Sequence, residues 1–154
     1  MAIYHCSISN VSRAKGSSSC ATLAYIKGAK IRDERKGNNY AYTRQERVLT
    51  VGTILPPYAP AEYANAETLF NAVEKHETAD NARTAKKIQV ALPNEFGLAE
   101  QKTIIENYIR NNLTKEGYCA VYAIHDGNEK KNGNPHAHIL VTNRPNKRQR
   151  RVER

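Results

Sequence analysis

The stretch GNPHAHILV, residues 133–141, places His136 and His138 two positions apart at the start of an apolar run. That run predicts a β-strand, on which the two side chains point to the same face, roughly 6–7 Å apart. His125 ends the preceding apolar segment, residues 118–126, which also predicts a strand. If the polar residues between the segments form a hairpin turn, the strands are antiparallel neighbours and the three imidazoles can converge on one face.

Three converging imidazoles predict a metal site with open coordination positions, which is typical of catalysis or substrate binding rather than of structural sites. All-imidazole ligation suits Mn, Co, Ni or Zn better than Ca or Mg. Asp126 follows His125 directly and would point to the opposite strand face, so we expect no carboxylate in the set. The alternative is that these histidines are structural strand residues.

The rest of the chain predicts one α+β domain. Period-2 patterns and turn residues predict strands at residues 2–9, 38–43, 47–55, 88–93, 118–126 and 136–143. Helical spacing and caps predict helices at residues 18–37, 67–77 and 98–117, with a second helical piece at 81–87. We expect the strands 38–43 and 47–55 to form a hairpin through residues 44–46. The sheet should be mostly antiparallel, with five or six strands and with helices packed on one face.

Composition restricts the class of protein further. The chain has 154 residues, which fits a single domain, and no apolar run approaches the ~20 residues of a membrane helix. Its N-terminus lacks a signal-peptide pattern, and its three cysteines are too dispersed for a disulfide framework or a thiolate site, so a reducing cytoplasm is expected. The net charge of +9 is partly concentrated in residues 143–154. We expect a domain at residues 1–142 followed by a basic tail, mobile or the start of a further region.

Four segments in order carry a family resemblance: residues 1–34, YAYTRQERV, ALPNEF, and AIHDGNEKKNGNPHAHILVTNRP. Together they resemble plasmid relaxases of the MobA/MobL type, within the HUH endonucleases named for their His–x–His strand. The resemblance covers almost the whole chain. It implies a metal-dependent enzyme that nicks one DNA strand at a plasmid origin of transfer for conjugative mobilisation.

The resemblance also implies the residues of the site. The nucleophile would be Tyr25, in CATLAYIKGAK, which attacks phosphorus and stays joined to the DNA as a 5′-phosphotyrosine. The ligands of the divalent ion would be His125, His136 and His138. Mn or Mg is the expected ion, with Co, Ni or Zn as alternatives. Since a free tyrosine is a poor nucleophile at neutral pH, it needs the help that a metal gives to the phosphate.

One position departs from the family pattern. Relatives commonly carry a glutamate just before the ALP segment, where this chain has Lys87. A charged lysine cannot accept the tyrosine proton, and it repels a divalent ion. Three accounts stay open: the proton leaves to water or metal hydroxide, a carboxylate such as Glu74, Glu77 or Glu95 substitutes, or this variant is impaired. The charge of Lys87 could also favour the phenolate form of Tyr25.

DNA contacts are predicted at four residues near the nucleophile. Arg13 and Lys15 precede the tyrosine segment and could bind phosphates, while Tyr40 and Tyr42 alternate with Ala41 and could stack on unpaired bases. Half-buried structural tyrosines are the alternative for the last two.

The implied partners are single-stranded or hairpin origin-of-transfer DNA, accessory mobilisation proteins and a type IV coupling protein, in a bacterial cytoplasm and without a membrane. Two other functions remain open. One is a relaxase-fold protein that binds origin DNA without cleaving it. The other is an unrelated histidine-liganded metal hydrolase acting on a small substrate.

Overall fold

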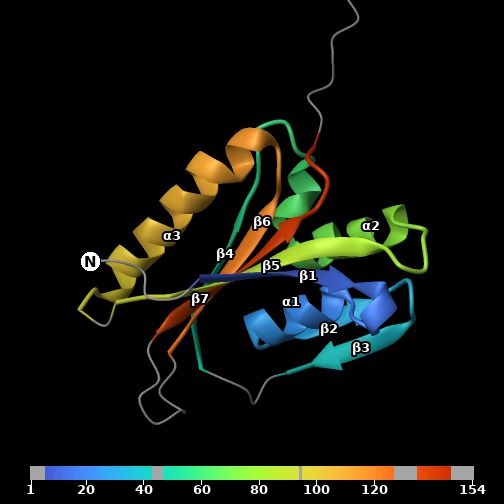
Figure 1. The fold of residues 1–154 in the computed structure, drawn as a ribbon, viewed down its shortest axis with the longest axis horizontal. Helices are drawn as coiled ribbons and strands as arrows, with labels where there is room; N and C mark the ends of the chain where they lie inside the picture. The colour runs from blue at the N-terminus through green and yellow to red at the C-terminus, as the bar shows by residue number, and fades with distance from the viewer. Residues whose placement is uncertain (1–5, 43–46, 94, 127–134, 147–154) are drawn as a thin grey trace, which may run out of the picture.

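The computed structural model describes residues 6–42, 47–93, 95–126 and 135–146 (Figure 1). Its main sheet has five strands in the order β1-β5-β7-β6-β4, and each neighbouring pair is antiparallel. A separate antiparallel pair consists of β2 and β3. The strands are β1 (Cys6–Ser12), β2 (Lys30–Asp33), β3 (Asn38–Ala41), β4 (Val48–Ile54), β5 (Arg83–Ala91), β6 (Ala120–His125) and β7 (His136–Thr142). The helices are α1 (Ser19–Lys27), α2 (Ala66–His76) and α3 (Leu98–Asn112). The predicted α+β class with an antiparallel sheet is confirmed.

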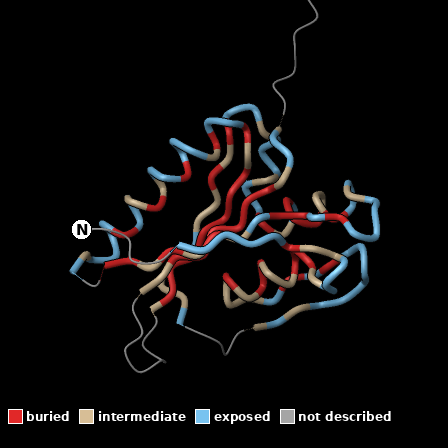
Figure 2. Tube along the Cα trace, in the orientation of Figure 1, coloured by how far each residue is buried: buried red, intermediate tan, exposed pale blue. Residues whose placement is uncertain are grey.

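Two hydrophobic cores lie on opposite faces of the main sheet. Consecutive residues of β6 contribute to both, because Val121 faces the core under α1 and α2 while Tyr122 faces the core under α3. In β7, Leu140 and Ile139 divide in the same way. Figure 2 shows these central strands buried along their length. The prediction of helices on one face was wrong, because strands that are apolar at consecutive positions need cover on both faces.

Helix α1 is shorter than the sequence predicts. The Ser18 side chain accepts a hydrogen bond from the Cys20 amide and so caps the first turn. Gly28 ends the helix with a φ of 63°, in the left-handed region that glycine adopts without strain. The helix predicted at residues 18–37 was wrong in its second half, because Gly28 and not Gly37 stops it and the chain continues into β2.

Strand pairing differs from the prediction in two places. β3 pairs with β2 while β4 pairs with β6, so the expected β3–β4 hairpin was wrong, and its residues 44–46 lie outside the described chain. The helical piece predicted at residues 81–87 was also wrong, because residues 83–87 form the first half of β5. Alanine and lysine favour a helix there, but β5 pairs with β1 on one edge and β7 on the other, and this pairing overrides propensity.

The other two helices begin close to where the sequence predicts them, but α3 ends at Asn112 and not at Gly117, because a separate 3-10 turn covers Thr114–Glu116. α2 buries Leu69 and Phe70 against α1, and α3 buries Ile105 and Ile109 against the sheet. Each such side chain contributes about 1.5–3 kcal/mol when fully buried. In the part of the chain that the structure describes, no helix combines the length and apolar character needed to cross a membrane.

Candidate active site

The three histidines predicted as metal ligands meet at one end of the β6–β7 pair. His125 ends β6 and lies opposite His136 at the start of β7, while His138 lies opposite Ala123 on the same face. The ring centroid of His138 is 4.4 Å from that of His125 and 4.9 Å from that of His136. One ring nitrogen from each histidine lies within 4.8 Å of the other two. This spacing allows the three nitrogens to share one metal ion.

A hydrogen bond to helix α1 fixes the orientation of His125. Its Nε2 lies 2.7 Å from the carbonyl oxygen of Ile26. Because a carbonyl only accepts, Nε2 donates this hydrogen bond, and Nδ1 is the ring nitrogen that would bind a metal. Ile26 lies in the last turn of α1, where carbonyl groups lack partners within the helix. One bond therefore satisfies a helix-end carbonyl and sets the tautomer of a predicted ligand, an arrangement that is common around metal-bound histidines.

These residues fit a divalent metal ion. His125 is 0% exposed and His138 is 2% exposed, so the sheet and α1 hold both rings in place. Neutral imidazoles are ligands for Mn, Co, Ni and Zn. Within the described residues, the cluster able to hold a metal consists of histidines alone, which agrees with the expectation that Asp126 stays outside it. The C-terminal end of α1 approaches this cluster, and its partial negative charge favours a bound cation.

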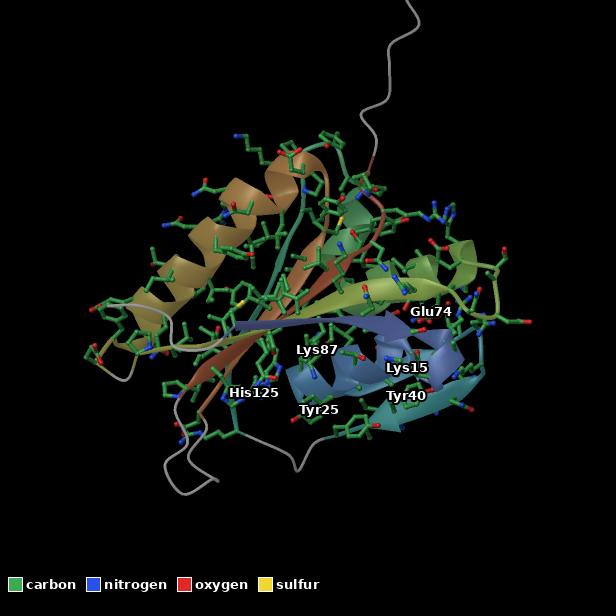
Figure 3. The ribbon with its side chains drawn as sticks, viewed as in Figure 1. Lys15, Tyr25, Tyr40, Glu74, Lys87 and His125 are labelled. Carbon is green, nitrogen blue, oxygen red and sulfur yellow. The ribbon has the colours of Figure 1, made fainter. Side chains whose placement is uncertain are left out.

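Tyr25 lies beside the three histidines although 100 positions separate it from His125 in the sequence. Its ring centroid is 5.9 Å from that of His138, with the planes at 90°, and 6.2 Å from that of His125. Figure 3 shows Tyr25 at the end of α1 that faces His125. The structure thus brings the predicted nucleophile and the predicted ligands together.

Lys87 projects from β5 over the ring of Tyr25. Its Nζ lies 5.2 Å from the ring centroid, within the range of a cation–π contact. Lys87 pairs with Leu140 of β7, and the next residue on the same face, Gln89, pairs with His138. The position where relatives were expected to carry a glutamate therefore lies at the predicted nucleophile, and here it supplies a positive charge.

The carboxylates considered as substitutes for that glutamate lie in other surroundings. Glu74 is 2% exposed and forms an ion pair with Arg13, and Figure 3 shows it near the end of α1 remote from His125. The Glu77 carboxylate is paired with Arg144, which is the main reason that its pKa lies below the usual value. Glu95 is exposed in the turn before α3. These positions do not support any of the three as the base for Tyr25.

Tyr40 and Tyr42 open onto the same hollow as Tyr25. This hollow, the Tyr25 groove, has a volume of about 340 Å³. Its lining residues are Gly16, Ser17, Ser18, Ala21, Thr22, Tyr25, Tyr40, Tyr42 and Lys87. The Tyr42 ring meets the Tyr25 ring edge to face, with centroids 6.0 Å apart. Lys15 is exposed on the turn next to Gly16, so three of the four predicted DNA-contact residues lie in or beside the groove.

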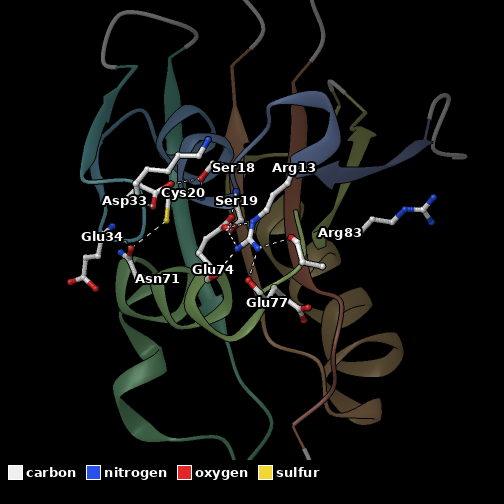
Figure 4. A network of polar contacts seen from close by, with 12 residues as sticks. Arg13, Ser18, Ser19, Cys20, Asp33, Glu34, Asn71, Glu74, Glu77 and Arg83 are labelled. Atoms are coloured by element: carbon white, nitrogen blue, oxygen red, sulfur yellow. Dashed lines mark hydrogen bonds and ion pairs between the residues drawn. The ribbon is translucent and has the colours of Figure 1, made fainter. Parts of the chain in front are cut away.

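The fourth, Arg13, is turned into the protein. Its side chain is 5% exposed, and its Nη2 lies 2.7 Å from Glu74 Oε2. The other carboxylate oxygen of Glu74 accepts hydrogen bonds from the Ser19 amide at 2.8 Å and the Ser19 hydroxyl at 2.7 Å. Figure 4 shows this network joining the turn after β1, the start of α1 and helix α2. Arg13 thus holds the start of the helix that carries Tyr25, and its placement does not support the predicted DNA contact.

Sequence reasoning missed three contributors to the site. The Ile26 carbonyl is a main-chain group, so residue type carries no signal for it. Gln89 lies beside His138, and a correct assignment of β5 would have shown it through strand alternation. Glu74 was considered only as a base, because its pairing with Arg13 joins positions 61 residues apart.

The first residues of the predicted tail contact the domain. The Asn143 side chain donates a hydrogen bond to the Arg83 carbonyl, and Arg144 forms an ion pair with Glu77. The main-chain N–H of Asn146 donates a hydrogen bond to the Gly117 carbonyl. Residues 147–154 lie outside the described chain. A domain boundary at residue 142 stays a prediction.

Fold and site together define the class: the chain belongs to the MobA/MobL family, whose model matches residues 17–153. It is 60% identical to a protein described as probable mobilization protein MobA from Bifidobacterium longum (strain NCC 2705). The alignment extends over 144 residues and covers 94% of this chain and 25% of that protein. Mobilization protein MobL from Acidithiobacillus ferridurans is 32% identical over 164 residues, covering 92% of this chain and 43% of that protein. A solved structure described as "Molecular Basis of Vancomycin Resistance Transfer in Staphylococcus aureus" matches with a TM-score of 0.85 and 30% identity, over 96% of this chain and 73% of that one.

The family resemblance predicted from the sequence is confirmed, and an unrelated metal hydrolase is set aside. The chain spans only 25% and 43% of the length of the two curated relatives described above. What the longer proteins do as a whole therefore comes to this chain only as a proposal.

Proposed function

We propose that this chain is the nicking domain of a conjugative relaxase, which cleaves one strand of DNA at a plasmid origin of transfer through Tyr25. The observation that carries the proposal is the convergence of the phenol of Tyr25, on α1, with three imidazoles from the neighbouring strands β6 and β7. A nucleophile beside an open, all-histidine metal site suits transfer of a phosphoryl group, because the phosphate can contact both at once.

In the proposed reaction, Tyr25 Oη attacks the scissile phosphorus. The bond from phosphorus to the tyrosine oxygen forms as the bond to the 3′ oxygen breaks. The phenol proton passes to solvent, and the 3′ oxygen takes up a proton to become a hydroxyl. One phosphoester replaces another, so the reverse attack by the 3′-hydroxyl can rejoin the strand.

The protein side chains divide the remaining work. His125, His136 and His138 would hold a divalent ion, with Mn or Mg as the proposed native metal and Co, Ni or Zn as alternatives. When bound, such an ion polarises the phosphate and offsets the negative charge that develops in the transition state. Lys87 is positioned over Tyr25, where its charge favours both a phenolate and an approaching phosphate.

Membership of the family supports a wider setting for the proposal. We propose a bacterial cytoplasmic protein whose partners are single-stranded or hairpin origin-of-transfer DNA, accessory mobilisation proteins and a type IV coupling protein. Residues 143–154 would lead into a further region of the kind that the longer relatives contain.

The test is formation of a covalent protein–DNA adduct. A tiled set of single-stranded oligonucleotides from the DNA flanking the gene is incubated with the protein and Mn or Mg, and adducts are separated by denaturing electrophoresis. We expect one oligonucleotide to give an adduct that Tyr25→Phe abolishes and that Tyr108→Phe, an exposed tyrosine on α3, retains. No adduct from any tile, or an adduct that survives Tyr25→Phe, contradicts the proposal.

The charge at Lys87 favours one alternative, a relaxase-fold protein that binds origin DNA without cleaving it. That function predicts binding of hairpin DNA and no adduct in the native protein. Lys87→Glu distinguishes the two: if the lysine impairs cleavage, the variant gains an adduct, whereas an active native site loses rate on the same change.

A further inference from the structure

The Tyr25 groove includes residues beyond those that the proposed nucleophile and the proposed metal site need. It extends from Tyr25 along the exposed side of α1 to Gly16, away from the three histidines. We infer that the Tyr25 groove seats one nucleotide of single-stranded DNA next to the scissile phosphate, with its base against Tyr40 and its phosphate at Lys87. This inference rests on the proposed function and assigns a subsite within it.

The first observation is the space that the groove leaves. Its α1 wall consists of small residues, with Ala21 and Thr22 one helical turn before Tyr25 and Ser18 a further turn before them. The volume of about 340 Å³ falls at the lower end of the ~300–1,000 Å³ of ligand pockets. A ligand of one nucleotide suits this size better than a longer segment.

The second observation is the charge of the groove. Among the described residues that line it, Lys87 is the charged one, and none is acidic. Asp33 accepts a hydrogen bond from Ser18 Oγ at 2.8 Å but is only 1% exposed, so its carboxylate lies behind the groove wall. A surface with a cation and no exposed carboxylate favours an anionic ligand such as a DNA phosphate.

The third observation is the aromatic wall opposite α1. Tyr40 and Tyr42 both pack partly against the core beneath α1, which holds their rings in place. The Tyr42 ring meets the Tyr25 ring edge to face. Tyr40 lies farther along β3, toward the start of α1, as Figure 3 shows for Tyr40 and Tyr25. A fixed aromatic ring in a cationic groove is the usual device for stacking an unpaired base without reading its sequence.

The experiment measures binding of fluorescein-labelled dT12 to the 154-residue protein in EDTA, by fluorescence anisotropy over a series of NaCl concentrations. Omitting metal separates this subsite from the histidines. The slope of log K against log [NaCl] counts phosphate contacts, at about 0.7 per contact on single strands. Loss of a stacking contact lowers the affinity without changing the slope, so the two roles give different signatures.

For the phosphate, we expect Lys87→Gln to reduce the magnitude of the salt slope by about 0.7. The matched control is Lys86→Gln, since Lys86 is exposed on the neighbouring position of β5 and faces the other side of the sheet. An unchanged slope in Lys87→Gln, or an equal change in Lys86→Gln, overturns the phosphate contact.

For the base, we expect Tyr40→Leu to weaken dT12 binding roughly 5- to 100-fold at an unchanged salt slope. Ala21→Leu, which fills the groove and leaves every aromatic ring in place, should weaken binding similarly. The controls are Tyr58→Leu, an exposed tyrosine outside the groove, and Ala99→Leu, an exposed alanine in the first turn of α3. Native binding by both Tyr40→Leu and Ala21→Leu, with circular dichroism showing intact folds, overturns the subsite.

The two proposals fail separately. If the groove variants behave as expected but no tile gives a Tyr25 adduct, the nucleotide subsite stands and the nicking function is wrong. If the adduct forms and the groove variants bind dT12 like the native protein, nicking stands and the subsite is wrong.

Discussion

Replacing Arg13 with methionine removes the positive half of a buried ion pair and leaves the negative half behind. The Arg13 and Glu74 side chains are 5% and 2% exposed, so the Glu74 carboxylate cannot recover its hydration without local opening. Loss of one partner from a buried pair costs about 3–5 kcal/mol of unfolding free energy. Because Glu74 keeps the amide and hydroxyl of Ser19 as donors, we expect the lower end, about 3 kcal/mol. For a domain of this size that corresponds to a melting temperature lower by roughly 6–12 °C.

The measurement is urea unfolding followed by circular dichroism. The control is Arg83→Met, because Arg83 is exposed on β5 and its side chain points away from the network in Figure 4, so its loss should stay within about 0.5 kcal/mol. The double variant Arg13→Met/Glu74→Leu should recover part of the loss, since no isolated charge then remains buried. A loss below about 1 kcal/mol in Arg13→Met, or a salt slope for dT12 reduced by about 0.7, refutes the structural role and restores Arg13 as a phosphate contact.

Two further predictions concern the cysteines and Gly28. Burial raises the pKa of Cys20 to about 12 and that of Cys119 to about 11, so both thiols are protonated at pH 8. Ellman's reagent should therefore react only with the exposed Cys6 in the native protein, and with all three thiols after denaturation. A second reactive thiol in the native protein contradicts this. Gly28→Ala should lower the free energy of unfolding by about 1–2 kcal/mol because its φ of +63° strains an alanine, and its new Cβ would also lie 3.0 Å from Val48 Cγ2. Gly16→Ala has a similar φ of +76° but its Cβ meets nothing within 4 Å, so we expect it to cost less. Equal losses by urea unfolding would remove the Val48 contact from the argument.

The part of the site that the sequence predicts is the part built from local rules. Strand alternation places His136 and His138 on one face, and the antiparallel pairing of β6 with β7 brings His125 opposite His136. These relations need only neighbouring residues, so they survive errors made elsewhere. Tyr25 was predicted from the family resemblance alone, since its approach to the histidines depends on how α1 crosses the sheet.

What the sequence did not predict depends on distant partners. β4 looks like the hairpin partner of β3, but its ladder is with β6, about 70 residues later. Residues 83–87 have helical propensity until β1 and β7 pair with them from both sides. Arg13 looks like an ordinary loop cation in the sequence. Its ion-pair partner, the buried Glu74 carboxylate, is brought to it only when α2 packs against α1. In each case a local preference yields to a contact that no local window contains.

The hydrogen bond from His125 to the Ile26 carbonyl makes one ligand of the cluster depend on the path of the main chain. Its acceptor is a main-chain group, so the bond does not depend on the chemistry of the Ile26 side chain, which packs in the core. Conversely, any change that unwinds the last turn of α1 displaces the Tyr25 phenol and releases the His125 ring in a single event. The proposed nucleophile and the proposed ligand would then be gained or lost as one unit. Measurements of metal affinity would report on the integrity of a helix that contributes no side chain to the proposed ligand set.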